Sequence, residues 1–268
     1  MKDIQSQADH RRINIKKVGV KDISYPITVL DKAKLVQHTV AMVNMYVSLP
    51  HRFKGTHMSR FIEILNRFHG KIGLKSFRPL LEEMKRKLEA QAAHVELQFP
   101  YFLKKARGRA NAIGMAEYRC RMHGSLDDEE EELTLEVQVP ITPLLPAQDT
   151  EGLPRSPGRW GVANVQLRFR HFIWIEDLIQ MVEEVISHKR WAISPVTPEE
   201  SSLSVESVTS ALGERLASHP DIRRFTVTVE NLAEGYSTFA SLEWPYNEDE
   251  SADELVSALP CRSTAGLN

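Results

Sequence analysis

Side chains that can bind an anion gather in one short stretch, residues 50–61, where strand-like alternation changes to helical spacing. The side chains in it that could contact a phosphate are Arg52, Lys54, Thr56, His57 and Arg60. The first turn of a helix beside them adds unpaired N–H groups and the positive end of the helix dipole. The pattern therefore suits a phosphate site, and it suits equally an ordinary strand-to-helix turn whose charges face water.

The composition bounds the kind of protein that carries this stretch. With 268 residues, of which 42% are hydrophobic, the chain can form one large domain or two smaller ones. Its formal net charge of -2 gives no reason to expect a nucleic acid or an acidic membrane as partner. The polar start of the chain and the lack of a run of about 18 apolar residues predict a cytoplasmic protein. Cys120 and Cys261 stand far apart, which predicts neither a disulfide framework nor a zinc ribbon.

The spacing of apolar residues predicts the elements of the first half, because strands repeat every two residues and helices every 3.6. The predicted strands are 23–29, 39–49, 95–99 and 118–122, and the predicted helices are 58–68 and 77–88. The first helix is predicted to bury Met58, Phe61, Ile62, Leu65 and Phe68. The charged outer face of the second helix is most simply a solvated surface.

The acidic run from Asp127 to Glu132 predicts a boundary, because like charges in sequence repel one another and resist burial. The same order of elements then begins again. The predicted strands of the second half are 133–141, 163–169, 225–229 and 236–242, and its helices are 175–186 and 205–216. The sequence thus predicts an α+β fold of two antiparallel four-stranded sheets, each covered on one face by two helices. The predicted units are residues 1–126 and 127–246, followed by a disordered tail at 247–268. The uncovered sheet faces predict a homo-oligomer.

Several short motifs resemble those of the GTP cyclohydrolase IB family. In the first half they are Val18-Gly19-Val20-Lys21, Tyr25-Pro26-Ile27, Gln37-His38-Thr39-Val40-Ala41 and Lys54-Gly55-Thr56-His57-Met58-Ser59-Arg60-Phe61-Ile62-Glu63. Three further motifs, Phe99-Pro100-Tyr101-Phe102, Val139-Pro140-Ile141-Thr142 and Val229-Glu230-Asn231, extend the resemblance over residues 3–246.

The resemblance implies a tandem tunnelling fold, assembled into homotetramers whose active sites lie between subunits. It implies an enzyme that converts GTP and water into 7,8-dihydroneopterin triphosphate and formate, which is the first step of tetrahydrofolate and pterin synthesis. The family uses a divalent metal such as zinc or manganese, and a bound metal supplies a nucleophile by lowering the pKa of water to about 7.

The positions that hold the metal in the family carry other residues in this chain. The family's Cys-Pro-Cys-Ser stretch reads Leu145-Pro146-Ala147-Gln148, and its Gly-Ala-His-Asn segment reads Gly161-Val162-Ala163-Asn164. The family's glutamate falls at Ile193 and its hairpin histidine at Tyr236. None of these replacements is a usual ligand for zinc or manganese, so the sequence predicts no bound metal and no cofactor. Gln148, Asp149 and His171 lie near the same loops and leave a rebuilt site open.

The residues that would recognise the substrate are retained. Glu206 matches the glutamate that in tunnelling-fold enzymes accepts hydrogen bonds from the ring N–H and amine of a purine or pterin. The resemblance makes His57 a candidate catalytic residue for proton transfer at the substrate ring, or else a candidate for binding the triphosphate. Lys54, Thr56 and Arg60 are candidates for binding the triphosphate. From the residues alone, Glu206 reads as an exposed acid on a helix and His57 as a histidine near a helix cap.

Two functions follow from this combination. The first is a GTP cyclohydrolase of type IB. The second is a catalytically inactive paralogue, a pseudoenzyme that binds a purine or pterin without hydrolysing it. A different reaction on such a ring, one that needs no metal, is a third possibility, because one fold serves several chemistries.

Overall fold

The computed structural model describes residues 15–33, 35–49, 57–68, 72, 76–107, 112–127, 130–141, 161–191, 204–232 and 235–245. The strands are β1 (Ile15–Asp31), β2 (Leu35–Leu49), β3 (Ala92–Arg107), β4 (Ala112–Leu126), β5 (Glu131–Ile141), β6 (Gly161–Phe169), β7 (Ile222–Leu232) and β8 (Ser237–Trp244). The helices are α1 (Met58–Arg67), α2 (Phe77–Leu88), α3 (Ile175–Trp191) and α4 (Val205–Ala217). Every strand and helix predicted from the sequence is present, in the predicted order.

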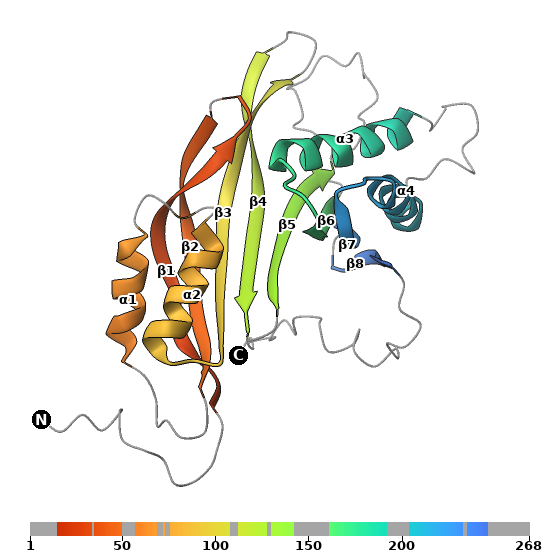
Figure 1. Cartoon of the computed structure of the whole chain (residues 1–268). Coiled ribbons are helices and arrows are strands. Elements are labelled where there is room, and N and C mark those ends of the chain that lie inside the picture. Colours follow the sequence, from red (N-terminus) through yellow and green to blue (C-terminus); the bar gives the residue numbers. More distant parts are fainter. Residues whose placement is uncertain are drawn as a thin grey trace, which may run out of the picture.

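The strands form one antiparallel sheet, in the order β1 to β8 (Figure 1). The sequence predicted two separate four-stranded sheets, and this was wrong because β4 pairs with β5 and joins the halves. The acidic run does not interrupt the sheet. Glu131 and Glu132 belong to β5, where their carboxylates form ion pairs with Arg78 at 2.8 Å and Arg168 at 2.6 Å. The repulsion that suggested a boundary is thus relieved by cations from α2 and β6.

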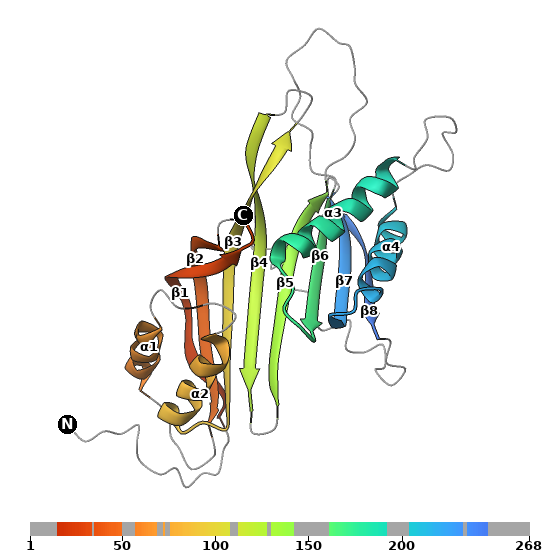
Figure 2. The same ribbon diagram turned by 45° about the horizontal axis from the view of Figure 1, so that its top comes forward.

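All four helices cover the same face of the sheet (Figures 1 and 2). In the first half α2 contacts β2, β3 and β4, and in the second half α4 contacts β7 and β8. Alternate residues of each strand point into this layer, as Val43, Met45 and Val47 do on β2, where all three are fully buried. Burying such a side chain contributes about 1.5–3 kcal/mol, so the period-two pattern fixes which face the helices cover.

The predicted apolar face of α1 was partly wrong. Met58 and Ile62 are exposed, whereas Ile64 is buried together with Phe61 and Leu65. The helix is therefore rotated so that residues 61, 64 and 65 meet the core. For α2 the prediction is confirmed, because Phe77, Leu80, Leu81, Met84 and Leu88 are all buried.

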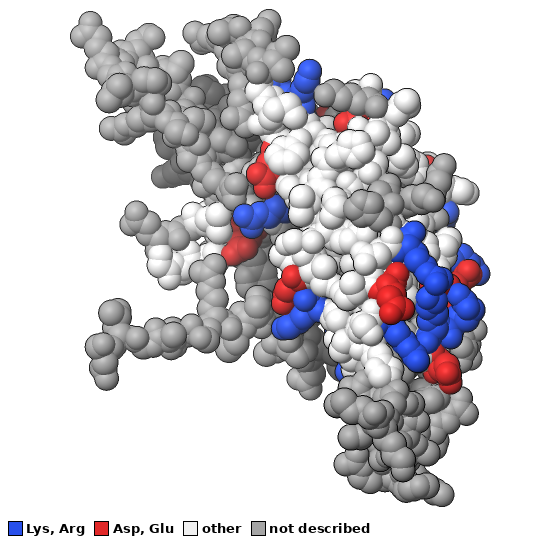
Figure 3. All heavy atoms as spheres, turned by 90° about the vertical axis from the view of Figure 1, so that its left-hand side faces the viewer, with Lys and Arg blue, Asp and Glu red and all other residues white. Residues whose placement is uncertain are grey.

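The outer surface of α1 and α2 carries a network of mixed charges (Figure 3). Glu83 accepts from Arg67 at 2.8 Å, pairs with Arg86 in a short contact, and lies 3.5 Å from Lys87. These pairs hold the pKa of Glu83 below its usual value, chiefly through the hydrogen bond from Arg86. In α1 and α2 six Lys and Arg side chains stand beside three Glu side chains, so this surface is mixed in charge with more cations than acids.

The two edge strands of the sheet and the face opposite the helices are not covered by other elements of the described chain. β1 and β8 are its edges, and the face opposite the helices is lined by the polar residues that alternate with the core positions. None of the helices in the described segments combines the length and apolar character needed to cross a membrane.

Candidate functional site

His57 and Arg60 lie at the start of α1, beside the β1 edge of the sheet. His57 is the N-cap of α1, its carbonyl accepts the Arg60 N–H at 3.1 Å, and its side chain caps no backbone N–H. Lys54 and Thr56 lie outside the described residues. The helix N-terminus on which the predicted phosphate site depended is thus present in the structure, at the start of α1.

The guanidinium of Arg60 turns away from this N-terminus. Its Nη1 donates to the carbonyl of Lys87, in the last turn of α2, over a long 3.4 Å. This carbonyl belongs to the negative end of a helix dipole, which attracts a cation. An anion bound at the start of α1 would therefore have to displace only the weak hydrogen bond between Arg60 and the Lys87 carbonyl.

Glu206 lies in the first turn of α4, behind the N-cap Ser204, whose Oγ accepts the N–H of Ser207 at 3.1 Å. Its carboxylate is exposed and is favoured there by the helix dipole. The helix runs along the edge strand, because Thr209 Oγ1 lies 3.4 Å from the Ala240 carbonyl of β8. Because Gly213 faces Leu242 further along the strand, α4 runs in the same direction as β8, and Glu206 lies toward the start of β8.

The structure does not bring together Arg60 and Glu206, the two predicted substrate residues that lie in its described segments. α1 lies beside β1, and α4, the helix that carries Glu206, lies beside β7 and β8, with the rest of the eight-stranded sheet between the two helices (Figure 2).

Ala163 and Tyr236 are the positions that the resemblance assigned to the family's metal ligands and that fall in described segments. Leu145, Ala147 and Ile193, like Gln148 and Asp149, lie outside them. The Ala163 side chain is 0% exposed and faces the helix-covered core between Val139 and Val229. Tyr236 is 69% exposed at the β7–β8 turn.

These two positions do not suit a shared metal ion. A methyl group and a phenol are poor ligands, and position 163 points into the apolar core while position 236 faces solvent. His171, the third candidate for a rebuilt site, lies at the other end of β6 and contacts Asp221 at 2.9 Å. In the described segments, no three His, Cys, Asp or Glu side chains come together as a metal site.

A polar cluster that was not predicted from the sequence lies on the uncovered face of the first half. Tyr46 Oη donates to Glu96 at 2.9 Å, and Asn44 donates to the other oxygen of the same carboxylate at 3.0 Å. The ring of His94 stacks between those of Tyr46, at 4.8 Å, and His123, at 5.9 Å. Lys17 Nζ lies 3.5 Å from the centre of the Tyr46 ring. In the sequence, this cluster could have been recognised from the polar residues at every second position of the strand, His94, Glu96 and Gln98.

Burial and charge perturb this cluster. Burial lowers the pKa of His94, and His123 and Lys17 lower it further. Burial also lowers the pKa of His123. It would raise the pKa of Glu96, but the hydrogen bonds from Asn44 and Tyr46 outweigh it and hold that pKa below 4.5. Both histidines are therefore favoured in the neutral form beside an ionised glutamate.

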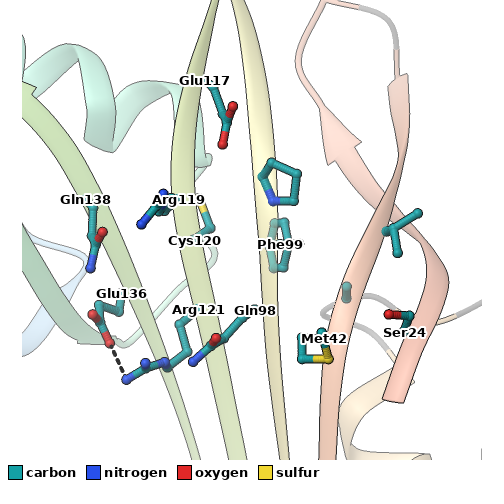
Figure 4. A pocket seen from close by; sticks show the side chains of 13 residues that line it. Ser24, Met42, Gln98, Phe99, Glu117, Arg119, Cys120, Arg121, Glu136 and Gln138 are labelled. Carbon is teal, nitrogen blue, oxygen red and sulfur yellow. Dashed lines mark hydrogen bonds and ion pairs between the residues drawn. The ribbon is translucent and has the colours of Figure 1, made fainter. Parts of the chain in front are cut away.

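A hollow of about 460 Å³ adjoins the cluster on the same face (Figure 4). Arg121 projects into it from β4 and donates to Glu136 of β5 at 3.3 Å. Gln98 and Gln138 line it from the neighbouring strands. The hollow is lined by cationic, anionic and neutral amide side chains, which together can donate and accept hydrogen bonds. Such a lining suits a polar solute. Cys120, at its base, is not an activated nucleophile, because burial raises the pKa of its thiol.

Comparison with known families decides the affiliation of the chain. A profile described as type I GTP cyclohydrolase FolE2 matches residues 1–233. The chain belongs to this family. The FolE2 match contains the start of α1, the positions at 145–163 and Glu206, and it ends before Tyr236.

Curated FolE2 relatives extend the similarity over nearly the whole chain. GTP cyclohydrolase FolE2 of Syntrophotalea carbinolica is 42% identical over 261 residues, covering 94% of this chain and 98% of the relative. The enzyme of that name from Pelobacter propionicus is 43% identical over 253 residues, covering 91% and 98%. The protein from Geobacter metallireducens is 43% identical over 259 residues, covering 91% and 97%.

Solved structures with the same fold are uricases. The uricase of Arthrobacter globiformis superposes with a TM-score of 0.54 at 7% identity, covering 91% of this chain and 98% of the uricase. The uricase of Bacillus fastidious gives a TM-score of 0.51 at 8% identity, with coverages of 95% and 99%. At these identities the likeness concerns the fold alone, which is the tunnelling fold that the resemblance implied.

Proposed function

We propose that this FolE2 family member acts on GTP, as a GTP cyclohydrolase that forms 7,8-dihydroneopterin triphosphate and formate. The observation that carries the proposal is the match over residues 1–233, together with relatives named GTP cyclohydrolase FolE2 that align over more than nine-tenths of both chains. The proposed location is the cytoplasm.

The proposed site is shared between copies of the chain. Glu206 would bind the two-donor edge of the guanine, since a carboxylate can accept both hydrogen bonds at once. Lys54, Thr56 and Arg60 of another copy would bind the triphosphate, and His57 would lie at the substrate ring as the candidate catalytic residue. The separation of α1 and α4 across the sheet supports this arrangement. We propose a homotetramer built from two-unit chains, 1–126 and 127–246.

A second function is favoured by the buried methyl group of Ala163 and the exposed phenol of Tyr236. With such side chains at two metal positions, the chain would bind a purine nucleotide or pterin without hydrolysing it, as an inactive paralogue. The choice between the two proposals depends on turnover, which requires a nucleophile, whereas binding requires only the recognition residues.

A turnover assay separates these proposals. The full chain would be incubated with GTP and added manganese or zinc, while product is followed by pterin fluorescence after oxidation and the metal content of the protein is measured. Sustained product formation supports the cyclohydrolase. Tight GTP binding without product supports the inactive paralogue.

Calorimetry tests the binding site itself. Replacing Glu206 by Ala removes the acceptor of the guanine edge and should weaken GTP binding at least tenfold, because a lost charged hydrogen bond costs about 1.5–3 kcal/mol. Glu214→Ala is the matched control, since Glu214 is another exposed acid of α4. Equal affinities of the two variants would remove Glu206 from the site.

A further inference from the structure

A groove lies between Leu30 of the first half and, in the second half, the adjoining ends of β5 and β6 with the segment before α3, and it has no role in the proposed GTP site. Its volume is about 690 Å³, within the range of about 300–1,000 Å³ typical of small-molecule sites. Its apolar lining is formed by Leu30, Leu133, Phe169, Phe172 and Trp174. We call it the seam groove. It lies at the end of β6 that carries Phe169, whereas Ala163 and Glu206 lie toward the other end of the second half.

One wall of the seam groove can receive a flat ring. Phe172 packs edge to face against Trp174, with ring centres 4.9 Å apart and planes at 81°. Phe172 nevertheless remains 43% exposed, so part of its ring is open to solvent within the groove. A ligand ring laid against Phe172 would remove apolar surface from water and complete an aromatic cluster.

The charged lining of the seam groove consists of three acids, Glu130, Glu131 and Glu132, and three arginines, Arg168, Arg170 and Arg223, and Arg170 is left over because Glu131 pairs with Arg78 of α2, outside the groove. Each of its three acids faces an arginine. The pairs are Arg78 with Glu131 at 2.8 Å, Arg168 with Glu132 at 2.6 Å, and Arg223 with Glu130 at 3.8 Å. His171 contacts Asp221 at 2.9 Å. Arg170 lines the groove with an exposed guanidinium that has no acidic partner among the described residues, since only its backbone N–H is engaged, by the Asp221 carbonyl at 2.7 Å.

We infer that the seam groove binds a planar aromatic compound that carries a single anionic group, with its ring against Phe172 and its anion at Arg170. The guanidinium fork matches a carboxylate or a phosphate oxygen pair. Arg223 can assist, because its 3.8 Å contact with Glu130 is long and both side chains are more than half exposed. A dianion is less suited, because the remaining cations are neutralised by their acids.

Calorimetry of the full chain with 1-naphthoate and its neutral isostere 1-naphthamide tests this inference. We expect 1-naphthoate to bind with a dissociation constant below about 1 mM and 1-naphthamide to bind at least about tenfold more weakly. Arg170→Gln should weaken 1-naphthoate binding about tenfold while leaving 1-naphthamide unchanged, and Arg170→Lys should restore part of the loss. Phe172→Ala should weaken both probes.

Two control variants separate the seam groove from the general surface. Arg215→Gln removes an exposed arginine of α4, and Met115→Ala removes an exposed apolar side chain of β4; both should bind the probes like the unaltered chain. No binding of 1-naphthoate at millimolar concentration would overturn the inference. So would equal binding of the two probes, or 1-naphthoate binding that Arg170→Gln and Phe172→Ala leave unchanged. A failure here leaves the GTP site untouched, since Glu206 lies outside the groove.

Discussion

The hydroxyl of Tyr101 donates a hydrogen bond to Glu176 Oε1 at 2.6 Å, and this contact ties β3 of the first half to α3 of the second. The same carboxylate oxygen accepts the backbone N–H of Lys32 at 2.7 Å, from the β1–β2 turn. Lys32 Nζ also pairs with Asp177 at 2.6 Å. The start of α3 is therefore fixed by residues of the first half, which is why the two repeats act as one folded body around a shared sheet.

Tyr101→Phe should lower the free energy of unfolding by about 1.5–3 kcal/mol, because the Glu176 carboxylate loses a hydrogen bond in a buried setting. Urea unfolding followed by circular dichroism would measure the change. Tyr236→Phe is the control, since that hydroxyl lies on a side chain that is 69% exposed, and it should stay within about 0.5 kcal/mol of the unaltered chain. Equal stabilities of the two variants would contradict the role given to this contact.

Gly161 allows β6 to approach β7 closely. A Cβ atom added there would lie 2.0 Å from the Glu230 carbonyl oxygen, which belongs to the backbone and cannot rotate away. Gly161→Ala should therefore destabilise the fold by about 3 kcal/mol or more, measured by the same unfolding assay.

Gly213→Ala provides the comparison for this substitution. The added Cβ would lie 3.1 Å from Leu242 Cδ1, the end of a flexible side chain, and alanine favours a helix by about 1 kcal/mol over glycine. We expect this variant to remain within about 1 kcal/mol of the unaltered chain. A larger loss for Gly213→Ala than for Gly161→Ala would refute the steric argument.

Stability should fall as the pH is lowered from about 7 to 5, because His94 and His123 have pKa values below their usual 6.5 in the folded state. The unfolded chain then binds more protons than the folded one, so stability is fully present above 6.5 and is lost as the pH falls through the folded pKa values. Glu96 adds a separate loss below 4.5, since its folded pKa is also lowered.

Urea unfolding at several pH values checks this dependence. The double variant His94→Gln, His123→Gln should flatten the profile between pH 7 and 5. His38→Gln, on the exposed side of β2 and 3.2 Å from Thr28, is the matched control and should keep the slope of the unaltered chain. An unchanged slope in the double variant would show that other groups carry the pH dependence.

The sequence predicted the elements well because their burial is local and periodic. The apolar residues Val43, Met45 and Val47 alternate with other residues, and this spacing identifies the buried face of a strand even when the neighbouring strands are unknown. The pairing of β4 with β5 could not be read this way, since it depends on whether Glu131 and Glu132 find cations, and Arg78 and Arg168 are distant in sequence.

The site was harder to predict than the fold. The motif around His57 and the glutamate at 206 could be named from the resemblance, but their separation across the sheet follows only from the strand order. The stack of Tyr46, His94 and His123 involves three strands, so no spacing within one segment reveals it. The turn of Arg60 toward the Lys87 carbonyl depends on how α1 and α2 pack.

The β7–β8 end of the sheet exposes Leu232, Tyr236 and Phe239, and the proposed oligomer would cover these side chains. Phe239, which is 55% exposed on the uncovered face of the edge strand, is the best placed to be tested. Phe239→Lys should shift the chain to a smaller species in analytical ultracentrifugation, because an unpaired charge is costly to bury at an interface. Phe172→Lys, in the seam groove, should leave the assembly unchanged. If both variants sediment like the unaltered chain, the β8 edge does not form the contact, and Glu206 and His57 have to be joined in another way.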